Sequence, residues 1–288
     1  MHEFGIPRRD RIVAVIRGVT KYVKPPFSGD VCKKAYLLGF VLADFRRRRH
    51  GYQVDIGSGT THPEFTRLFK QLFTGYAPIQ ERPYFNGSTG MFGWHLDAQL
   101  HPSFEFLLLP KQVSAWVSIN SVVFKYFVAG YFDGEGTISI ARNSDKCAAF
   151  IAAIASGDKS ILIAINSWLL ELGFHPSFRL ARHAGDYNVF GGKKVFYRKS
   201  RWVLRLKRRA EVLRFIELLP LRHPEKLEKR KLMLSLRDKV YLDDVMPAWH
   251  CLRGKIEAGV NQYAHKAKLC LAARKGAESR RWLPAIQK

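Results

Sequence analysis

Two short segments of the chain share one pattern of residue types. Residues 37–44 (LLGFVLAD) and 128–135 (VAGYFDGE) are both apolar, helix-like runs with a glycine in the third position and an acid in the eighth. The acids are Asp44 and Glu135, and a domain-sized stretch of chain separates the two copies. Because a carboxylate is the only polar feature that both copies keep, we expect two half-sites that meet in the folded protein.

The position of each acid is unusual for a helix. A carboxylate at a helix C-terminus meets the negative end of the helix dipole, where a basic side chain is favoured. Gly39 and Gly130 lie inside the runs, where a glycine costs roughly 1 kcal/mol relative to alanine. We interpret these glycines as points of close contact between the two helices, along Gly39 and Ala43 on one helix and Gly130 and Gly134 on the other.

Such packing would make Asp44 and Glu135 neighbours. Two carboxylates at close range cannot both stay ionised without cost, and a bound divalent cation removes that cost. A site with few protein ligands, all of them oxygens, favours Mg²⁺, with Mn²⁺ as a substitute. The simpler alternative is that two amphipathic core helices happen to end in acids. Two copies with similar downstream sequences favour the metal site.

The charge of the chain indicates a polyanionic partner. The 288 residues carry a formal net charge of +24. Nucleic acid is favoured over a membrane surface, because the basic residues are spread over strand-like segments and do not collect on one amphipathic helix. Hydrophobic residues make up 47% of the chain, which is enough for a sizeable core and argues against wholesale disorder.

Other classes of site have little support in the sequence. The four cysteines form no Cys-x-x-Cys pair, which argues against a zinc finger or a disulfide scaffold and for a reducing, cytoplasmic compartment. No secretory signal peptide is visible, and the apolar stretch 113–132 contains too many polar residues for a membrane span. Residues 157–160 (GDKS) lack the core of a phosphate-binding loop, and the histidines lack metal-ligand spacing.

The elements after each acid follow one course. Each copy continues into strands, a helix, a second pair of strands and a closing helix that ends at a proline. The first copy is predicted as strand 52–56, helix 63–73, strands 83–85 and 91–100, and helix 103–109. The second is predicted as strands 137–141 and 148–155, helix 160–172, strands 176–182 and 195–207, and helix 210–219.

The predicted fold class is therefore α+β, with two pseudo-symmetric αββαββα repeats. The repeats are expected at residues 1–112 and 125–237, with a linker at 113–124 and a helical C-terminal tail at 238–288.

The motifs carry a family resemblance. The segment AGYFDGEG at 129–136 is close to the motif of the LAGLIDADG homing endonucleases, and LLGFVLADF at 37–45 is a degenerate copy with Leu42 and Phe45 in place of an acid and a glycine. Over residues 34–236 the chain resembles the single-chain, two-repeat kind of that family. The resemblance implies a saddle-shaped antiparallel sheet from each repeat on the DNA major groove. It also implies metal-dependent double-strand cleavage across the minor groove, leaving short 3′ overhangs.

The resemblance also assigns roles to residues. Asp44 and Glu135 are expected to bind the divalent metals. Catalytic assistance is expected from lysines that follow the proline-terminated helices: Lys111, Lys226 and Lys229. Weaker candidates near the metals are Gln53, Ser58 and Ser156. The alternative for the lysines is ordinary solvated surface charge.

Strand periodicity predicts the side chains that face DNA. Successive residues of a strand point to opposite faces, so polar residues that alternate with apolar ones are expected on one open face. In the first repeat these are Gln53, Asp55, Arg82, Tyr84, Asn86, His95, Asp97 and Gln99. In the second they are Arg179, His183, Arg201, Arg205 and Lys207. Such a mixture is typical of base readout. Arg46 and Arg48, within a run of four arginines, are expected to clamp phosphates. A solvated strand face is the alternative for any single residue.

The expected partner is double-stranded DNA with a long, partly asymmetric target site. No membrane and no obligate oligomer are expected, since one chain holds both half-sites. The protein is expected to be intron-encoded and cytoplasmic, associated with the nucleoid when it binds DNA. Two alternatives share the fold: a maturase that binds intron RNA, and a non-catalytic DNA-binding protein. The intact acids favour cleavage.

Overall fold

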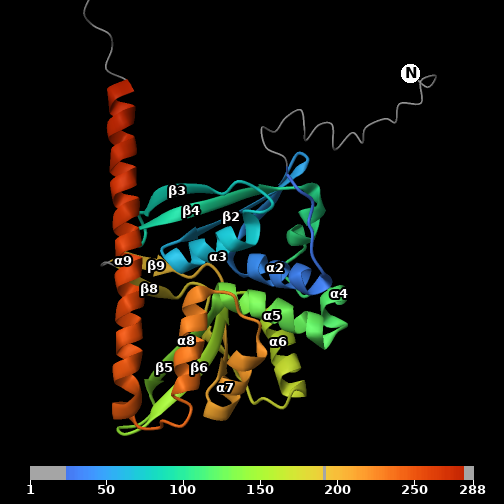
Figure 1. The fold of residues 1–288 in the computed structure, drawn as a ribbon, viewed down its shortest axis with the longest axis vertical. Coiled ribbons are helices and arrows are strands. Elements are labelled where there is room, and N and C mark those ends of the chain that lie inside the picture. Colours follow the sequence, from blue (N-terminus) through green and yellow to red (C-terminus); the bar gives the residue numbers. More distant parts are fainter. Residues whose placement is uncertain (1–23, 191–192, 282–288) are drawn as a thin grey trace, which may run out of the picture.

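The computed structural model describes residues 24–190 and 193–281 of the protein (Figure 1). Residues 1–23 of the predicted first repeat and 282–288 of the predicted tail lie outside the described residues. The first half contains helix α2 (Val31–Asp44), strands β1 (Arg46–His50) and β2 (Gln53–Thr60), helix α3 (Pro63–Phe73), strands β3 (Gln80–Asn86) and β4 (Met91–Leu100), and the 3₁₀ helix η1 (Pro102–Leu108). A short helix, α4 (Ala115–Ser118), leads into the second half.

The second half repeats this order with one insertion. It contains α5 (Ser121–Glu135), β5 (Gly136–Arg142), β6 (Ala148–Ser156), α6 (Lys159–Glu171), β7 (Ser177–Arg182), β8 (Tyr187–Phe190), β9 (Lys193–Phe196), β10 (Arg201–Leu206) and α7 (Arg209–Leu218). The hairpin of β8 and β9 is the insertion, and it forms a separate two-stranded sheet. The predicted α+β fold of two αββαββα repeats is confirmed, and the extra hairpin was not predicted.

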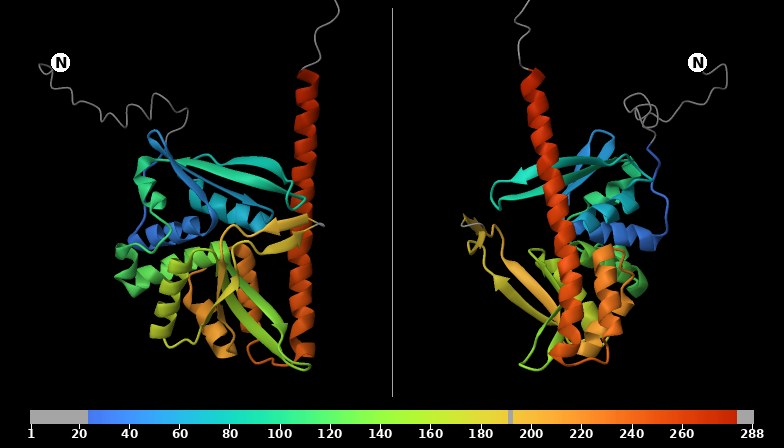
Figure 2. Two further views of the ribbon diagram at one scale, coloured as in Figure 1. Left: turned by 180° about the vertical axis from the view of Figure 1, so that it is seen from behind. Right: turned by 60° about the vertical axis from the view of Figure 1, so that its left-hand side comes forward.

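Each half builds one four-stranded antiparallel sheet. The strand order is β1-β2-β4-β3 in the first half and β5-β6-β10-β7 in the second. Burial alternates along the strands: in β6, Phe150, Ala152 and Ile154 are buried, whereas Ala149 and Ile151 are partly exposed. Helices cover the buried face of each sheet and leave the other face open (Figure 2).

Some predicted boundaries are wrong, for reasons of tertiary contact. Strand β1 forms from the arginine run because Arg47 donates hydrogen bonds to the carbonyl oxygens of Leu107 and Leu109, at 3.0 and 2.7 Å, which ties this edge strand to the end of η1. The predicted strand 195–207 is interrupted after β9 and resumes as β10. The closing helix of the first repeat, predicted at 103–109, is a 3₁₀ helix.

The motif helices α2 and α5 pack against each other at the centre of the molecule. A β-carbon on Gly39 would lie 2.1 Å from the carbonyl oxygen of Phe127, and one on Gly130 would lie 2.0 Å from that of Tyr36. Only glycine permits this approach of two backbones. Residues 35–43 of α2 are buried without interruption, as expected for a helix that is apolar on all sides. The interpretation of both glycines as helix contact points is confirmed.

Two helices follow the second repeat. Helix α8 (Pro224–Ser235) was not predicted, whereas α9 (Leu242–Arg281) is the predicted helical tail. Helix α9 runs past both repeats (Figures 1 and 2). Its Trp249 is buried with the core of the second repeat, and its Tyr263 stacks on Trp94 of β4 with ring centroids 5.5 Å apart. Of the described helices, none combines the length and apolar character needed to cross a membrane.

Candidate active site and nucleic-acid interface

The two motif acids end the two central helices. Asp44 is the last residue of α2, and Glu135 is the last residue of α5. Burial, and then the neighbouring Asp44 carboxylate, raises the pKa of Glu135 to about 7. Arg201, whose guanidinium lies 3.8 Å from the Glu135 carboxylate, opposes this shift. The surrounding protein also raises the pKa of Asp44, although this side chain lines an open pocket. The acids therefore interact as a pair.

The end of α2 is flanked by a lysine and a second-repeat acid. The Lys111 ammonium donates to the carbonyl oxygen of Ala43 at 3.3 Å and lies 3.0 Å from the carboxylate of Asp158. The Tyr131 hydroxyl donates to Ser156 at 2.9 Å and to Asp158 at 3.3 Å. Lys111 and Ser156 were predicted from the sequence, but Asp158 was not. Its place in the short connection between β6 and α6, two residues after Ser156, could have indicated it. The other serine candidate, Ser58, donates to the Asp44 carbonyl oxygen at 3.3 Å.

The end of α5 is held by a buried polar network. Asp133 is 1% exposed, and one carboxylate oxygen accepts hydrogen bonds from the Tyr36 hydroxyl at 2.5 Å and from the backbone N–H groups of Arg222 and His223 at 2.7 and 3.2 Å. Lys226 donates to two carbonyl oxygens in the last turn of α5, including that of Asp133 at 2.8 Å. Burial lowers the pKa of Lys226 to about 8, and Asp133 opposes that shift.

These contacts separate the three lysine candidates. Lys226 is buried and bound to helix carbonyl oxygens, so it is not solvated surface charge. Lys229 forms an ion pair of 2.6 Å with Glu225, which also lies 3.1 Å from the ring of His62 across the repeat boundary. Only Lys111 combines substantial exposure with a place beside the Asp44 end of α2.

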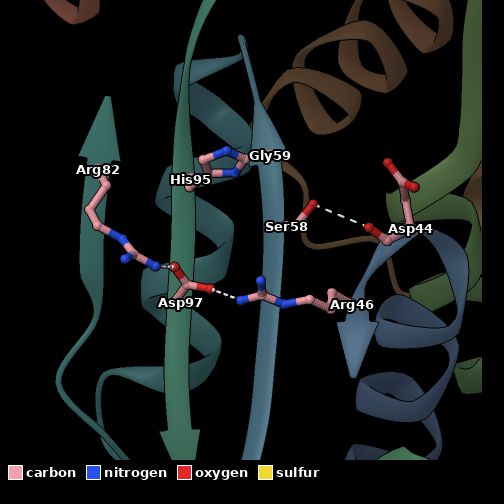
Figure 3. Close-up of a pocket in the computed structure, with 8 residues that line it drawn as sticks. Asp44, Arg46, Ser58, Gly59, Arg82, His95 and Asp97 are labelled. Atoms are coloured by element: carbon pink, nitrogen blue, oxygen red, sulfur yellow. Dashed lines mark hydrogen bonds and ion pairs between the residues drawn. The ribbon is translucent and has the colours of Figure 1, made fainter. Parts of the chain in front are cut away.

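A pocket of about 280 Å³ joins Asp44 to the open face of the first sheet (Figure 3). Arg46 of β1 starts beside Asp44 and extends across β2, and Arg82, His95 and Asp97 of β3 and β4 lie beyond it (Figure 3). The pocket is therefore lined both by a predicted metal ligand and by residues predicted to face DNA.

The open face of the first sheet gathers most of the predicted polar residues. Cross-strand register places Arg46 beside Gly57 and Gly57 beside Asp97, and likewise Arg48 beside Asp55 and Asp55 beside Gln99. Further along the same face, Arg82 pairs with His95. Tyr84 stacks on His95 with ring centroids 4.1 Å apart. Gln53 begins β2 and is partly exposed.

Three of the polar residues predicted to face DNA in the first repeat already have partners within the protein. Asp55 is 7% exposed; one carboxylate oxygen pairs with Arg48 and His50, and the other is buried without a hydrogen-bond partner. Asp97 has an arginine on each carboxylate oxygen. The Asn86 side chain accepts from backbone N–H groups of the β3–β4 turn and so stabilises that turn.

The second sheet differs from the first on its open face. Arg205 faces Ala153 on one neighbouring strand and Ser177 on the other, and Arg179 lies exposed opposite Val203. Two predicted residues fall just outside the strands, since His183 follows β7 and Lys207 follows β10.

Arg201, which is predicted to face DNA, lies beside the second motif acid. Its guanidinium donates to the Ala155 carbonyl oxygen at 3.0 Å and lies 3.8 Å from the Glu135 carboxylate, and its side chain is 43% exposed.

The sequence and fold comparisons agree with this geometry. Residues 125–220 match the model of the LAGLIDADG-like domain. The homing endonuclease I-WcaI, solved bound to its DNA recognition sequence, is 12% identical with a TM-score of 0.50, and the alignment covers 79% of this chain and 95% of that one. Residues 125–220 are thus a LAGLIDADG-like domain, and the two repeats together have a fold similar to that of I-WcaI.

Other solved structures show weaker similarity. I-DmoI in complex with DNA and Ca is 16% identical over 69% of this chain and 96% of that one, with a TM-score of 0.44. Full-length DUF199/WhiA from Thermatoga maritima is 16% identical over 74% of this chain, with a TM-score of 0.47, and this chain spans only 63% of its length. No curated protein sequence matches the chain.

The two acids fit a hard divalent cation that takes two carboxylates from the protein and its remaining ligands from water and substrate. Within residues 24–190 and 193–281 there is no group of three or more histidine, cysteine, aspartate or glutamate side chains that could hold a metal ion. Mg²⁺ is commonly bound by one or two carboxylates together with water and substrate phosphates. Burial, and then the Asp44 carboxylate, raises the pKa of Glu135, and a bound cation would favour the charged form of both acids.

Proposed function

We propose that the protein is a sequence-specific endonuclease of double-stranded DNA that depends on a divalent metal, with Mg²⁺ as the expected ion and Mn²⁺ as a substitute. One observation carries the proposal: the glycine contacts between α2 and α5 bring Asp44 and Glu135 together between two open, basic sheets. Carboxylates between two sheets that bind DNA would hold cations beside the DNA phosphates, which supports a role in phosphodiester hydrolysis.

The roles of the side chains follow from their positions. Asp44 and Glu135 would hold the cations, which supply an activated water and charge stabilisation for phosphodiester hydrolysis. Lys111 lies beside the Asp44 end of α2, where its ammonium can stabilise negative charge that develops on the scissile phosphate. Arg201 offers a second cationic group next to Glu135. Asp158 holds Lys111 in place through an ion pair that spans the two repeats.

The expected products follow from the two-repeat arrangement. Each acid belongs to one repeat, so each repeat would direct hydrolysis of one strand. The two cuts would lie across the minor groove and leave short 3′ overhangs, as the family resemblance implies. A protein that binds DNA or intron RNA without cutting is the outcome that would replace this proposal.

The test compares cleavage by the wild type with that by an Asp44→Asn/Glu135→Gln double variant. Purified protein is incubated with a library of long duplex sites in Mg²⁺ or Ca²⁺. We expect discrete Mg²⁺-dependent double-strand cuts from the wild type, and at least about a thousandfold slower cutting with retained binding from the variant, since metal-assisted charge stabilisation contributes several kcal/mol.

A matched control separates chemistry from net charge. The Asp145→Asn/Asp238→Asn variant changes the net charge by the same amount at two exposed acids, and it should cut like the wild type. Specific DNA binding without any cut, from wild type and double variant alike, would overturn the nuclease function. Specific binding of the intron RNA alone would point to a maturase.

A further inference from the structure

One carboxylate on the first sheet bridges two arginines from different strands. Asp97 on β4 lies 2.6 Å from Arg46 of β1 through one oxygen and 2.5 Å from Arg82 of β3 through the other (Figure 3). The Asp97 side chain is 14% exposed, whereas those of Arg46 and Arg82 are 60% and 52% exposed. The acid is thus covered by the two guanidinium groups, and the guanidinium groups face solvent.

A glycine makes this bridge possible. Gly57 of β2 lies between Arg46 and Asp97 in the cross-strand register. A β-carbon at Gly57 would lie 2.4 Å from a carboxylate oxygen of Asp97 and 3.2 Å from the Arg46 guanidinium. The bridge therefore crosses β2 over a position without a side chain. The nearest obstructed atom is the end of a flexible side chain, and the Leu96 carbonyl oxygen, at 3.2 Å, would have to shift by only a few tenths of an ångström. An alanine at Gly57 would therefore displace the bridge with a small adjustment of β4.

The bridge changes what each residue can recognise. Both oxygens of Asp97 already accept a hydrogen bond from an arginine, and the side chain is only 14% exposed, so little of the carboxylate is left for the amino group of cytosine. Each arginine contacts Asp97 through one terminal nitrogen. A guanidinium has five N–H donors, so the others are free to bind a base. The planar fork of arginine matches the O6 and N7 acceptors of guanine.

The bridge also favours bases over phosphates. The shared carboxylate cancels part of the positive charge that attracts phosphates, and it fixes both side chains before binding, which lowers the entropic cost of a directed contact. A single arginine on a flexible stem has neither property. From the sequence, Arg46 is expected to contact the phosphate backbone, but its ion pair with Asp97 argues for base reading instead.

We propose that Asp97 is a positioning residue that presets Arg46 and Arg82 to read two guanines on the first-repeat side of the target. Because these residues share a pocket with Asp44, the guanines would lie on the Asp44 side of the first-repeat half-site. The proposal rests on the DNA binding of the proposed function but not on cleavage. The second sheet has no equivalent, because its four strands contain no aspartate or glutamate.

The test is selection of bound duplexes from a randomised library in Ca²⁺, which reports binding without requiring cleavage. The wild type should select guanine at two positions of one half-site. Arg46→Ala should lose one preference and Arg82→Ala the other, each by about tenfold or more, as expected for a bidentate arginine–guanine contact. Asp97→Asn should weaken both preferences at once.

Gly57→Ala provides the decisive variant, because it displaces the bridge and alters no charged group. It should weaken both guanine preferences as Asp97→Asn does. Arg205→Ala on the second sheet is the matched control and should leave both preferences intact. Thermal unfolding of each variant checks that the fold persists.

Several results would overturn the proposal. Arg46→Ala and Arg82→Ala variants that weaken binding to all sequences equally, with a smaller salt dependence, would identify phosphate contacts. Retention of both guanine preferences by Asp97→Asn and Gly57→Ala would remove the role of Asp97. Selection of guanines without any cleavage in Mg²⁺ would contradict only the nuclease function. A failure to select any sequence would overturn the guanine contacts together with specific DNA recognition.

Discussion

The ends of the two motif helices differ more than their shared pattern indicates. Two residues before the acid, α2 has the apolar Leu42 and α5 has the buried carboxylate of Asp133. The lysine next to α2, Lys111, is 38% exposed and reaches across to the second repeat. The lysine next to α5, Lys226, is enclosed among helix carbonyl oxygens and Asp133.

The comparison shows that the packed pair of helices α2 and α5 has two ends with different surroundings. The close contact at Gly39 and Gly130 is the same from either side, and it places both acids. The α5 end adds a polar network that ties α2, α5 and the start of α8 together, whereas the α2 end stays open toward the pocket. We infer that the second end mainly stabilises the arrangement and that the first end is freer to contact substrate.

The largest expected effect concerns the two lysines. Lys226→Met removes the cation beside Asp133 and leaves helix carbonyl oxygens without a donor, so we expect a loss of about 3 kcal/mol or more in the free energy of unfolding. Lys111→Met removes a half-exposed ion pair and should cost less than about 1 kcal/mol. Urea unfolding of both variants measures the difference. Equal losses would mean that the two helix ends are equivalent.

A second prediction tests the symmetry of the helix contact. Gly130→Ala would place a β-carbon against the backbone of α2, and Gly39→Ala would do the same against α5. Each should lower the free energy of unfolding by about 2 kcal/mol, the usual cost of overpacking a rigid contact. The control is Gly254→Ala in α9, where a β-carbon meets no atom within 4 Å and alanine should be neutral or slightly stabilising. Stability unchanged in the first two variants would contradict the close packing.

The smallest expected effect is a gain in stability. The pKa of Glu135 is about 7 in the folded protein, against an ordinary value of 4.5, so the folded state holds a proton that the unfolded state has lost between these pH values. Stability is therefore lost as the pH rises through this window. Glu135→Gln should be more stable than the wild type by about 1–2 kcal/mol at pH 8 in EDTA, after allowance for solvent screening, and equal to it at pH 4.

The control for this prediction is Glu217→Gln, which alters an acid that is 49% exposed and paired with Arg237. Urea unfolding at both pH values should show no pH-dependent gain for that variant. If Glu135→Gln gave no gain at pH 8, the two motif acids would be too far apart or too well solvated to repel each other.

Much of the site could be predicted because its signals are local. Asp44 and Glu135 are the last residues of recognisable glycine-containing helices, and alternation along β4 predicts His95, Asp97 and Gln99 on one face. Phe45 shows how a departure from the motif is absorbed. It takes an extended backbone conformation and packs on Phe40 and Phe69, so the glycine of the family motif is not needed there.

The missed residues depend on partners that are distant in the sequence. Asp133 is held by the Tyr36 hydroxyl of the other repeat, and Asp158 is held by Lys111 across the repeat boundary. Glu225 joins a helix that was not predicted to a histidine of the first repeat. None of these contacts affects the spacing of apolar and polar residues within one helix or strand, so no local sequence pattern could reveal them.

The sequence by itself determined the repeated αββαββα order, the glycine contact points and the two acids, since each follows from periodicity or spacing within a short segment. The tertiary structure alone decided which charges neutralise one another. Asp97 pairs with Arg46 and Arg82 only because three strands lie side by side over Gly57. Lys226 is buried only because α8 packs against the end of α5. The strength of such pairs depends on distance and burial, and both arise when separate segments meet.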